Sequence, residues 1–474
     1  MNLRRTGLSI AGLLAFVASA AEAPAPRTVA VAAKPDAPWA SYPTRTLDDL
    51  PAAVAAPADA HLNQYGGLAP RQTNATGFFR VAQQDGRWWL VDPEGGLFLS
   101  KGVSSVKTVP TPGAEAALRS MFGSAAGWAE RTTALLREHG FNGVGAWSDT
   151  EGLRAVARPL PYTRIWNFMS RYGRTRGGTF QQPGHTGYPN DCLFVFDPEF
   201  ETFCDAHARQ LAAAKDDPWL LGHFSDNEMP LQREALKKYL GLPEKDPGRQ
   251  AAFDWLRNRR GPQATEKDIT PQDEADFQAV VVGRYFRIVS RAIKRHDPNH
   301  LYLGSRFYGA DLRYPEIFKA AGPHVDVVSV NYYRAWTPDR DRLEMWARES
   351  GKPVLITEWY AKGADSGLAN TGGAGWLVKT QRDRGLFYEN FTLGLLESRV
   401  CVGWHWFKYV DNDPDDQKVD PSNRDSNKGI VSNRYAPYRP LLDSMKRINE
   451  RVYGLAEHFD QRQKASMTAS RQNP

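Results

Sequence analysis

The sequence predicts an α/β fold, a (β/α)8 TIM barrel with a short N-terminal β-hairpin extension. Short apolar runs alternate with longer helical patterns, which is typical of βα units around a parallel sheet. Eight such units can be placed, and several of their strands are apolar throughout, as expected when both faces of a strand are buried. An open doubly wound sheet is the structural alternative.

Three segments precede the predicted barrel. Residues 1–23 combine Arg4 and Arg5 with an apolar stretch and two A-x-A sites, which is typical of a secretory signal peptide, with an anchoring helix as the alternative. Residues 24–60 are rich in Ala and Pro, so we expect a linker or a loosely attached arm. Residues 61–96 hold two strand patterns around a turn and are expected to form a β extension packed on the barrel.

Residues 97–457 are expected to form the barrel and residues 458–474 a polar tail. The predicted strands are Leu97–Val103, Gly143–Trp147, Tyr162–Asn167, Leu220–Ser225, Leu301–Phe307, Val325–Asn331, Pro353–Thr357 and Val400–Phe407. The main predicted helices are Ala126–His139, Glu201–Ala214, Asp273–Arg295, Gln381–Glu397 and Pro437–Tyr453.

Composition and motifs exclude several classes of protein. The chain has 474 residues with 41% hydrophobic and 24% charged side chains, which places it in the ordinary globular class and excludes disorder of the whole chain. It lacks the spaced Cys and His ligands of a transition-metal site and the Gly-rich loops of nucleotide-binding proteins, so no metal, cofactor or nucleic acid is expected. There are three cysteines, of which Cys192 and Cys204 could either form a disulfide or be free thiols.

Two glutamates follow predicted strands at their carboxyl ends. Glu228 comes after the fourth strand and Glu358 after the seventh. In a barrel of this kind the catalytic groups lie at the carboxyl ends of the strands. Cleavage of a glycosidic bond needs two carboxyl groups, one to protonate the leaving oxygen and one to attack or stabilise the sugar carbon. The pair therefore predicts a glycoside hydrolase, although a single glutamate after a strand is more often a helix cap or a structural ion pair.

The chain resembles clan A of the retaining glycoside hydrolases and, more narrowly, glycoside hydrolase family 50, the β-agarases. The resemblance spans residues 78–453. It rests on these motifs: Trp88–Gly95, Gly102–Val106, Asp226–Glu228, Val330–Tyr333, Thr357–Trp359, Asp365–Leu368, Asn370-Thr371, Gly373–Gly375, Gly403–Phe407 and Ser426–Ile430.

This resemblance implies roles for individual residues. It makes Glu228 the general acid/base and Glu358 the nucleophile, at carboxyl separations of about 5–5.5 Å. It also implies that Asn227 binds the sugar 2-hydroxyl. Tyr333, or else Tyr332, would hold the nucleophile, and Trp404 would be the platform under the sugar.

Three further residues are candidates for substrate binding. Arg306 ends the fifth strand and could bind hydroxyls or orient a carboxylate, with a structural ion pair as the alternative. Trp147 ends the second strand and could line the cleft. His185 lies in a long Gly-rich loop that could shape the cleft rim.

The expected protein is thus a secreted or periplasmic enzyme that cleaves β-1,4-galactosidic bonds of agarose or agaro-oligosaccharides by double displacement. Another β-linked galactan or β-galactoside is the alternative, and a non-catalytic carbohydrate-binding barrel is the reading from a different class. Its partner is an oligo- or polysaccharide, with no membrane contact after signal removal. Of 60 basic and 54 acidic residues, 58 and 53 remain without residues 1–23. That near-balance predicts a nearly neutral cleft suited to a neutral polysaccharide.

Overall fold

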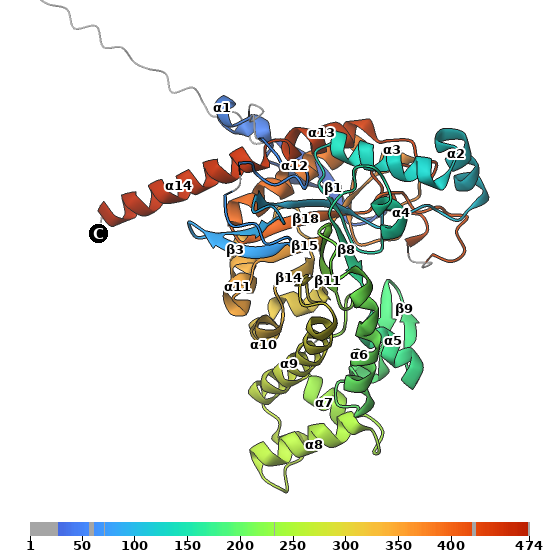
Figure 1. The fold of residues 1–474 in the computed structure, drawn as a ribbon. Coiled ribbons are helices and arrows are strands. Elements are labelled where there is room, and N and C mark those ends of the chain that lie inside the picture. Colours follow the sequence, from blue (N-terminus) through green and yellow to red (C-terminus); the bar gives the residue numbers. More distant parts are fainter. Residues whose placement is uncertain (1–26, 56–60, 71, 232, 420–422, 473–474) are drawn as a thin grey trace, which may run out of the picture.

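A curled parallel sheet forms the centre of the computed structural model, which describes residues 27–55, 61–70, 72–231, 233–419 and 423–472 (Figure 1). Its nine strand segments follow the order β12-β11-β8-β7-β6-β18-β15-β14-β13. They are β6 (Ser100–Ser104), β7 (Gly143–Val144), β8 (Tyr162–Ile165), β11 (Leu220–Phe224), β12 (Leu301–Tyr302), β13 (Arg306–Phe307), β14 (Val328–Asn331), β15 (Val354–Glu358) and β18 (Cys401–Phe407).

The sheet closes because β12 and β13 are two halves of one barrel strand. β12 pairs with β11, and β13 pairs with β14 at the other end of the order. Between the halves, Leu303 N donates to His223 O at 2.9 Å and Ser225 N donates to Gly304 O at 2.9 Å. The ladder with β11 therefore continues past β12, and the nine segments make an eight-stranded barrel. The predicted fold class is confirmed.

Helices connect successive strands and surround the barrel. α9, the longest of the described helices, precedes the fifth barrel strand. It begins with a capping box in which the side chains of Thr270 and Asp273 each accept a hydrogen bond from the other's backbone N–H. The helices are α1 (Ala52–Ala55), α2 (Pro112–Phe122), α3 (Ala125–Glu138), α4 (Thr150–Arg154), α5 (Phe168–Arg176), α6 (Glu199–Ala208), α7 (Ala235–Leu240), α8 (Pro247–Arg260), α9 (Pro271–His296), α10 (Pro315–Ala321), α11 (Arg340–Ser350), α12 (Gln381–Ser398), α13 (Arg439–Asn449) and α14 (Val452–Gln472).

The predicted N-terminal hairpin is present and closes one end of the barrel. β3 (Arg80–Gln84), β4 (Arg87–Val91) and β5 (Leu97–Phe98) form an antiparallel sheet. Its apolar side chains belong to one buried cluster with residues near the starts of the barrel strands, namely Phe79, Leu90, Phe98, Leu221, Val327, Leu355 and Val402. Apolar side chains thus fill this end of the barrel, and the opposite end, where the strands terminate, is where catalytic groups belong.

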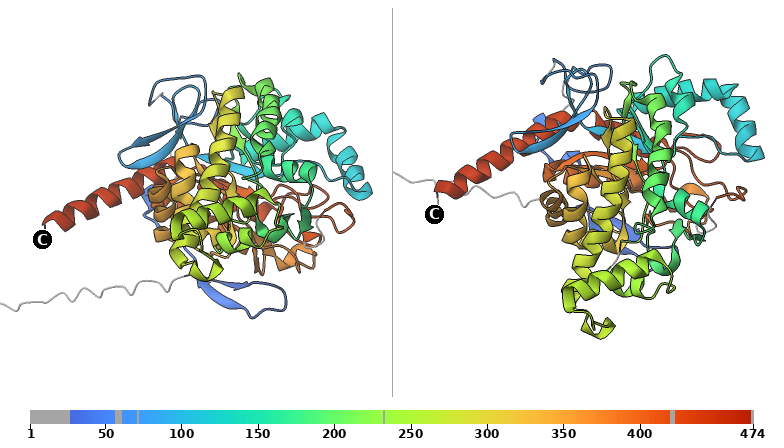
Figure 2. Two further views of the ribbon diagram at one scale, coloured as in Figure 1. Left: turned by 90° about the horizontal axis from the view of Figure 1, so that it is seen from below. Right: turned by 60° about the horizontal axis from the view of Figure 1, so that its bottom comes forward.

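The expectation of a linker at residues 24–60 is wrong for its described part beyond Arg27. β1 (Thr28–Ala32) and β2 (Ala40–Pro43) form a hairpin, and β1 also pairs with β17 (Trp376–Val378). β17 in turn pairs with β16 (Ala361–Gly363), so four short strands make a second sheet (Figure 2). The short apolar run of β1, in an Ala-rich segment, is held in a sheet by β17, a partner strand almost 350 residues away.

The expectation of a polar tail at residues 458–474 also needs correction. α14 runs through this segment to Gln472 and projects from the body of the molecule (Figure 1). Asp460 on α14 accepts two hydrogen bonds from Nε of the fully buried Arg87, both at 3.0 Å. It also accepts from Nε of Arg399 at 2.7 Å. The carboxylate thus joins the N-terminal hairpin to the last helix.

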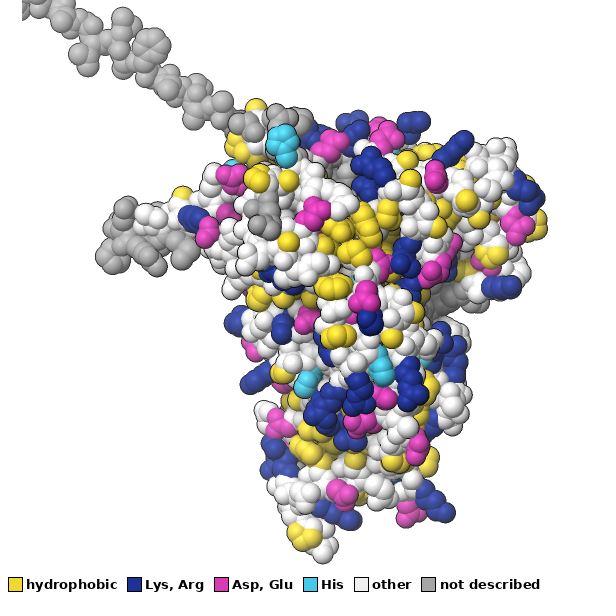
Figure 3. Space-filling view, viewed as in Figure 1, with side chains coloured by type: hydrophobic (Ala, Val, Ile, Leu, Met, Phe, Trp, Pro, Cys, Tyr) yellow, Lys and Arg dark blue, Asp and Glu magenta, His cyan; other side chains and the backbone are white. Residues whose placement is uncertain are grey.

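The predicted signal peptide, residues 1–23, lies outside the described residues. Among the helices that are described, none has the length and apolar character needed to cross a bilayer. The three cysteines are buried free thiols, so Cys192 and Cys204 do not pair. On the face shown in Figure 3, basic and acidic side chains are interspersed.

Replacing Asp460 by Ala should lower the free energy of unfolding by about 3 kcal/mol, because the buried Arg87 guanidinium loses its counter-charge. The control is Asp443→Ala, since Asp443 is exposed on α13 and forms no ion pair with a described residue. Thermal and urea unfolding of both variants measures the difference. Equal stability of the two variants would contradict a structural role for the C-terminal helix.

Candidate active site

A cavity of about 1990 Å³ lies at the carboxyl ends of the barrel strands. Ser105 after β6, Trp147 after β7, Glu228 after β11 and Glu358 at the end of β15 all line it. The structure thus brings the two predicted glutamates into one cavity, together with Asn227, Tyr333, Trp147 and His185.

Several strand ends at this cavity turn sharply through left-handed residues. The φ angles are +54° at Ser105, +60° at Trp147, +49° at Glu228 and +61° at Arg334. Non-glycine residues adopt such angles only where surrounding contacts hold them, and they gather at functional sites. At Glu228 the turn is held by its backbone N–H, which donates to Arg306 O at 3.0 Å.

Glu358 is a buried carboxylate with a donor at each oxygen. Its side chain is only 6% exposed. Nη2 of Arg306 lies 2.8 Å from Oε1, and the Tyr333 hydroxyl donates to Oε2 at 2.5 Å. These two contacts fix the orientation of the carboxylate and balance its buried charge.

Arg306 is the residue that orients this site. It is fully buried, and its guanidinium also donates to Asn227 Oδ1 at 3.0 Å and to Thr357 O at 2.8 Å. The indole of Trp147 lies 4.2 Å from the guanidinium carbon, a cation–π contact. Arg306 is not part of the cavity wall. Of the roles expected for it, the structure supports orientation of a carboxylate and not contact with substrate.

Glu228 lies in a different environment. Its Oε1 accepts from Nδ2 of Asn331 at 2.8 Å, and no described cation lies within ion-pairing distance of it. Burial raises the pKa of Glu228 well above its ordinary value, and the negative charge of Glu358 raises that pKa further. Glu228 therefore keeps its proton at a pH where an ordinary glutamate has lost it.

An amide pair lies between the two carboxyl groups. Asn227 Oδ1 accepts from Arg306 and from Nδ2 of Asn331, at 3.0 and 3.1 Å. Asn331 Oδ1 in turn accepts from the Thr357 hydroxyl at 2.8 Å. With its oxygen engaged twice, Asn227 presents its amino group as a donor to a ligand in the cavity that it lines.

The structure does not place Trp404 in the cavity, so its expected role as a sugar platform is wrong. Trp404 and Trp406 occupy positions i and i+2 of β18 and therefore share one face, toward the helices. Both are fully buried, and Nε1 of Trp404 donates to the Tyr388 hydroxyl on α12 at 3.0 Å. Phe407, on the opposite face of β18, lines the cavity instead.

Tyr332 and His185 take lesser places. Tyr332 borders the cavity but is only 2% exposed, and its hydroxyl accepts from Asp339 N at 3.0 Å. Of the two tyrosines, Tyr333 is thus the one that contacts Glu358. His185 lies on β10 (His185–Gly187) at the cavity rim, where its Nε2 is 3.2 Å from the Tyr308 hydroxyl.

Sequence reasoning missed several residues of the site. Asn331 could have been found, because it is a polar residue at the end of a predicted strand. Tyr360, Trp376 and Lys428 also line the cavity, but they come from the long connections that follow β15 and β18, with Trp376 at the start of β17. Nothing in the local pattern of a loop indicates which of its residues turn inward.

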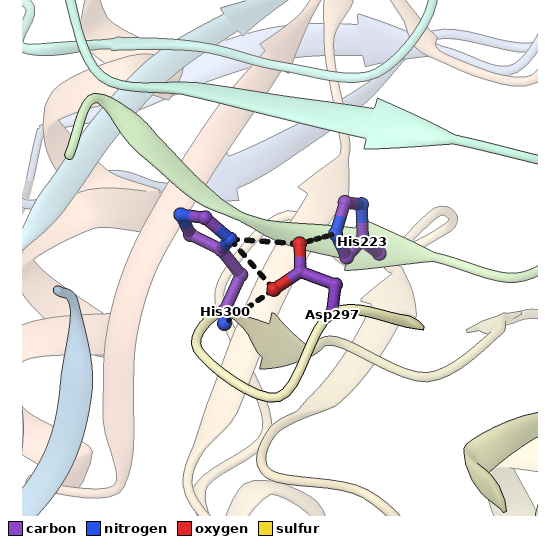
Figure 4. Close-up of side chains that lie close together, drawn as sticks. All are labelled: His223, Asp297 and His300. Carbon is purple, nitrogen blue, oxygen red and sulfur yellow. Dashed lines mark hydrogen bonds and ion pairs between the residues drawn. The ribbon is translucent and has the colours of Figure 1, made fainter. Parts of the chain in front are cut away.

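One group of side chains in the described part has the composition of a metal site; it lies on β11 and just before β12, outside the cavity wall (Figure 4). His223 Nε2 and His300 Nδ1 lie 2.7 and 2.8 Å from Asp297 Oδ2. Nε1 of Trp166 donates to Nδ1 of His223 at 3.0 Å, so the ring proton of His223 is on Nε2. A metal bound at Nε2 would require that proton on Nδ1, opposite another donor. The group therefore fits a buried hydrogen-bonded cluster and not a metal centre.

The chain is similar in sequence to two β-agarases over most of its length. The chain is 28% identical over 495 residues to β-agarase B of Vibrio sp. (strain JT0107) and 28% identical over 491 residues to β-agarase A of the same strain. These matches cover 82% and 83% of the chain, which spans about half the length of these curated relatives. No model of a known protein family matches the sequence.

Solved structures match most of the chain. The crystal structure of BpGH50 aligns with a TM-score of 0.78 and 30% identity, covering 92% of this chain and 96% of that one. The agarase AgWH50C aligns with a TM-score of 0.69 and 26% identity, covering 85% of this chain and 68% of that one.

Replacing Glu358 by Gln should lower the pKa of Glu228, because a negative charge beside its carboxyl group is removed. Carboxyl-¹³C NMR measures this titration, with the Glu228 signal assigned from its loss in Glu228→Gln. Glu266→Gln is the control, since Glu266 is exposed and distant in the chain from the site. An unchanged or higher pKa in Glu358→Gln would show that the two carboxyl groups do not interact.

Proposed function

The chain belongs to glycoside hydrolase family 50, and from this membership and the site geometry we propose that it is a retaining β-glycosidase that cleaves β-1,4-galactosidic bonds of agar-type galactans. The relatives named as agarases support the substrate class. The observation that carries the mechanism is the contrast between the two carboxyl groups. Glu358 is paired with Arg306 and Tyr333, while burial and Glu358 raise the pKa of Glu228.

In the first step Glu358 attacks the anomeric carbon as the bond to the leaving sugar breaks. Glu228 gives its proton to the glycosidic oxygen, so the leaving sugar departs as a neutral alcohol. The product of this step is a galactosyl ester of Glu358. The Arg306 contact keeps the carboxylate aimed at the sugar and stabilises it again when it leaves.

In the second step the ionised Glu228 takes a proton from water as the water oxygen attacks the anomeric carbon. The ester bond to Glu358 breaks, and Glu228 ends the cycle protonated. Two inversions at the same carbon leave the β configuration unchanged. The amino group of Asn227 is the donor for the sugar 2-hydroxyl, a bond that strengthens as positive charge develops at the neighbouring carbon.

Export from the cytoplasm is also part of the proposal. It is supported by the signal-like pattern of residues 1–23 and by the polymeric nature of the substrate, which cannot pass a membrane intact. N-terminal sequencing of the protein recovered from its native host measures whether cleavage occurs near Ala20 or Ala23.

Glu228→Gln and Glu358→Gln should each lower kcat on agarose oligosaccharides by about 10²–10⁴-fold, because each removes one half of the acid–nucleophile pair. Glu266→Gln should retain wild-type kcat. Time-resolved proton NMR of the wild-type reaction should show the β anomer first. The α anomer as first product would rule out double displacement, and binding without hydrolysis by the wild type would favour a non-catalytic barrel.

A further inference from the structure

The cavity that holds the two glutamates is rich in basic side chains. Nine of its lining residues are Lys or Arg and four are Asp or Glu, and two of those four are Glu228 and Glu358 themselves. The nearly neutral cleft expected from the overall charge is therefore wrong. A chain with balanced charge has concentrated cations at one site.

Several of these cations form no ion pair with a described carboxylate, whereas many basic residues elsewhere do. On the outer surface, arginines such as Arg176 and Arg259 each contact two carboxylates within 4 Å. In the cavity, by contrast, Arg342 has a described carboxylate within that distance, Asp339 at 3.9 Å, but several of the other cations form no ion pair with a described residue. The unpaired cations include Lys107, Arg313, Arg334, Lys408 and Lys418.

The unpaired cations lie on both sides of the nucleophile's strand. In the barrel order, β18 and β6 follow β15 on one side, and β14 and β13 follow it on the other. Lys408 and Lys107 come directly after β18 and shortly after β6. Arg334 and Arg313 come after β14 and β13. A glycan that crosses Glu358 thus meets cations in both directions.

Neighbouring cations that form no ion pair repel one another, and a bound anion would remove this repulsion. Burial and the nearby charge of Lys107 together lower the pKa of Lys408 to about 8, against the opposing effect of Asp411 and Asp416, so the charged form of this ammonium group is disfavoured in the free protein. Lys107, Arg313 and Arg334 are exposed. A neutral sugar chain would leave all of these charges unmatched.

We propose that the preferred substrate is a galactan bearing anionic groups, sulfate esters or carboxylates, on sugars to either side of the bond that is cut. This inference rests on the proposed galactan hydrolase activity and narrows it to one substrate class. Lys408 and Lys107 contact an anionic group on one side of the reacting sugar, and Arg334 and Arg313 contact one on the other. Tyr360, Phe407 and Trp147 remain available as apolar faces for the sugar rings.

The test compares kcat/KM for three sets of oligosaccharides of equal length, at low and high ionic strength. They are neutral agarose fragments, sulfated porphyran fragments, and agarose fragments whose primary hydroxyls have been oxidised to carboxylates. At least one anionic set should react faster than the neutral set, and its advantage should shrink as salt screens the cations. Whichever anionic set is preferred identifies sulfate or carboxylate as the recognised group.

Variants connect this preference to the cavity. Lys107→Gln and Arg313→Gln should each lower kcat/KM on the preferred anionic substrate by about two- to five-fold, the range expected for one partly exposed ion pair, and lower kcat/KM on the neutral substrate by less. The matched controls are Lys319→Gln and Arg382→Gln, because both residues are exposed and lie outside the cavity wall.

The outcomes separate the two levels of the proposal. Equal or faster hydrolysis of neutral fragments, with no salt effect, would overturn the anionic preference and leave the galactan hydrolase activity in place. Equal losses in the cavity variants and in the control variants would also overturn it. No hydrolysis of any of the three sets would overturn the proposed function itself.

Discussion

The buried guanidinium of Arg306 is the interaction on which the site depends. Its contacts reach Glu358, the Thr357 carbonyl and Asn227, and so join the ends of β15 and β11 across β13. Because the side chain is fully buried, it requires the Glu358 charge as much as Glu358 requires it. Removing either partner leaves an uncompensated charge, at a cost of about 3–5 kcal/mol. This pairing leaves Glu228 as the carboxyl group that forms no ion pair with a described residue.

The barrel makes that pairing possible through an irregular fifth strand. Regular pairing stops at Tyr302 and resumes at Arg306, with Gly304 at a φ of +75° between the halves. At the far end, the N-terminal hairpin fills the barrel with apolar side chains. The cavity therefore lies at the strand ends, where burial and different polar partners separate the roles of the two glutamates.

Much of this structure could be predicted from the sequence, for definite physical reasons. Strands buried on both faces are apolar throughout, so all eight barrel strands could be found, and polar residues at their ends identified Glu228 and Glu358. Pairings over long sequence distances could not be predicted, such as β1 with β17 or Arg87 with Asp460. The predicted role of Trp404 was wrong because the resemblance supplied that role without regard to which face of β18 the side chain occupies. The prediction of a nearly neutral cleft was wrong because net charge does not reveal where loops place their lysines.

The central claim is that Glu358 forms a covalent bond to the sugar. Incubation with an activated 2-deoxy-2-fluoro-β-galactosyl compound, followed by peptide mass spectrometry, tests it most directly, because the fluorine slows release of the ester. The account predicts one adduct, on the peptide that contains Glu358, and none in Glu358→Gln. An adduct on another carboxyl group, or time-dependent inactivation with no adduct at all, would contradict it.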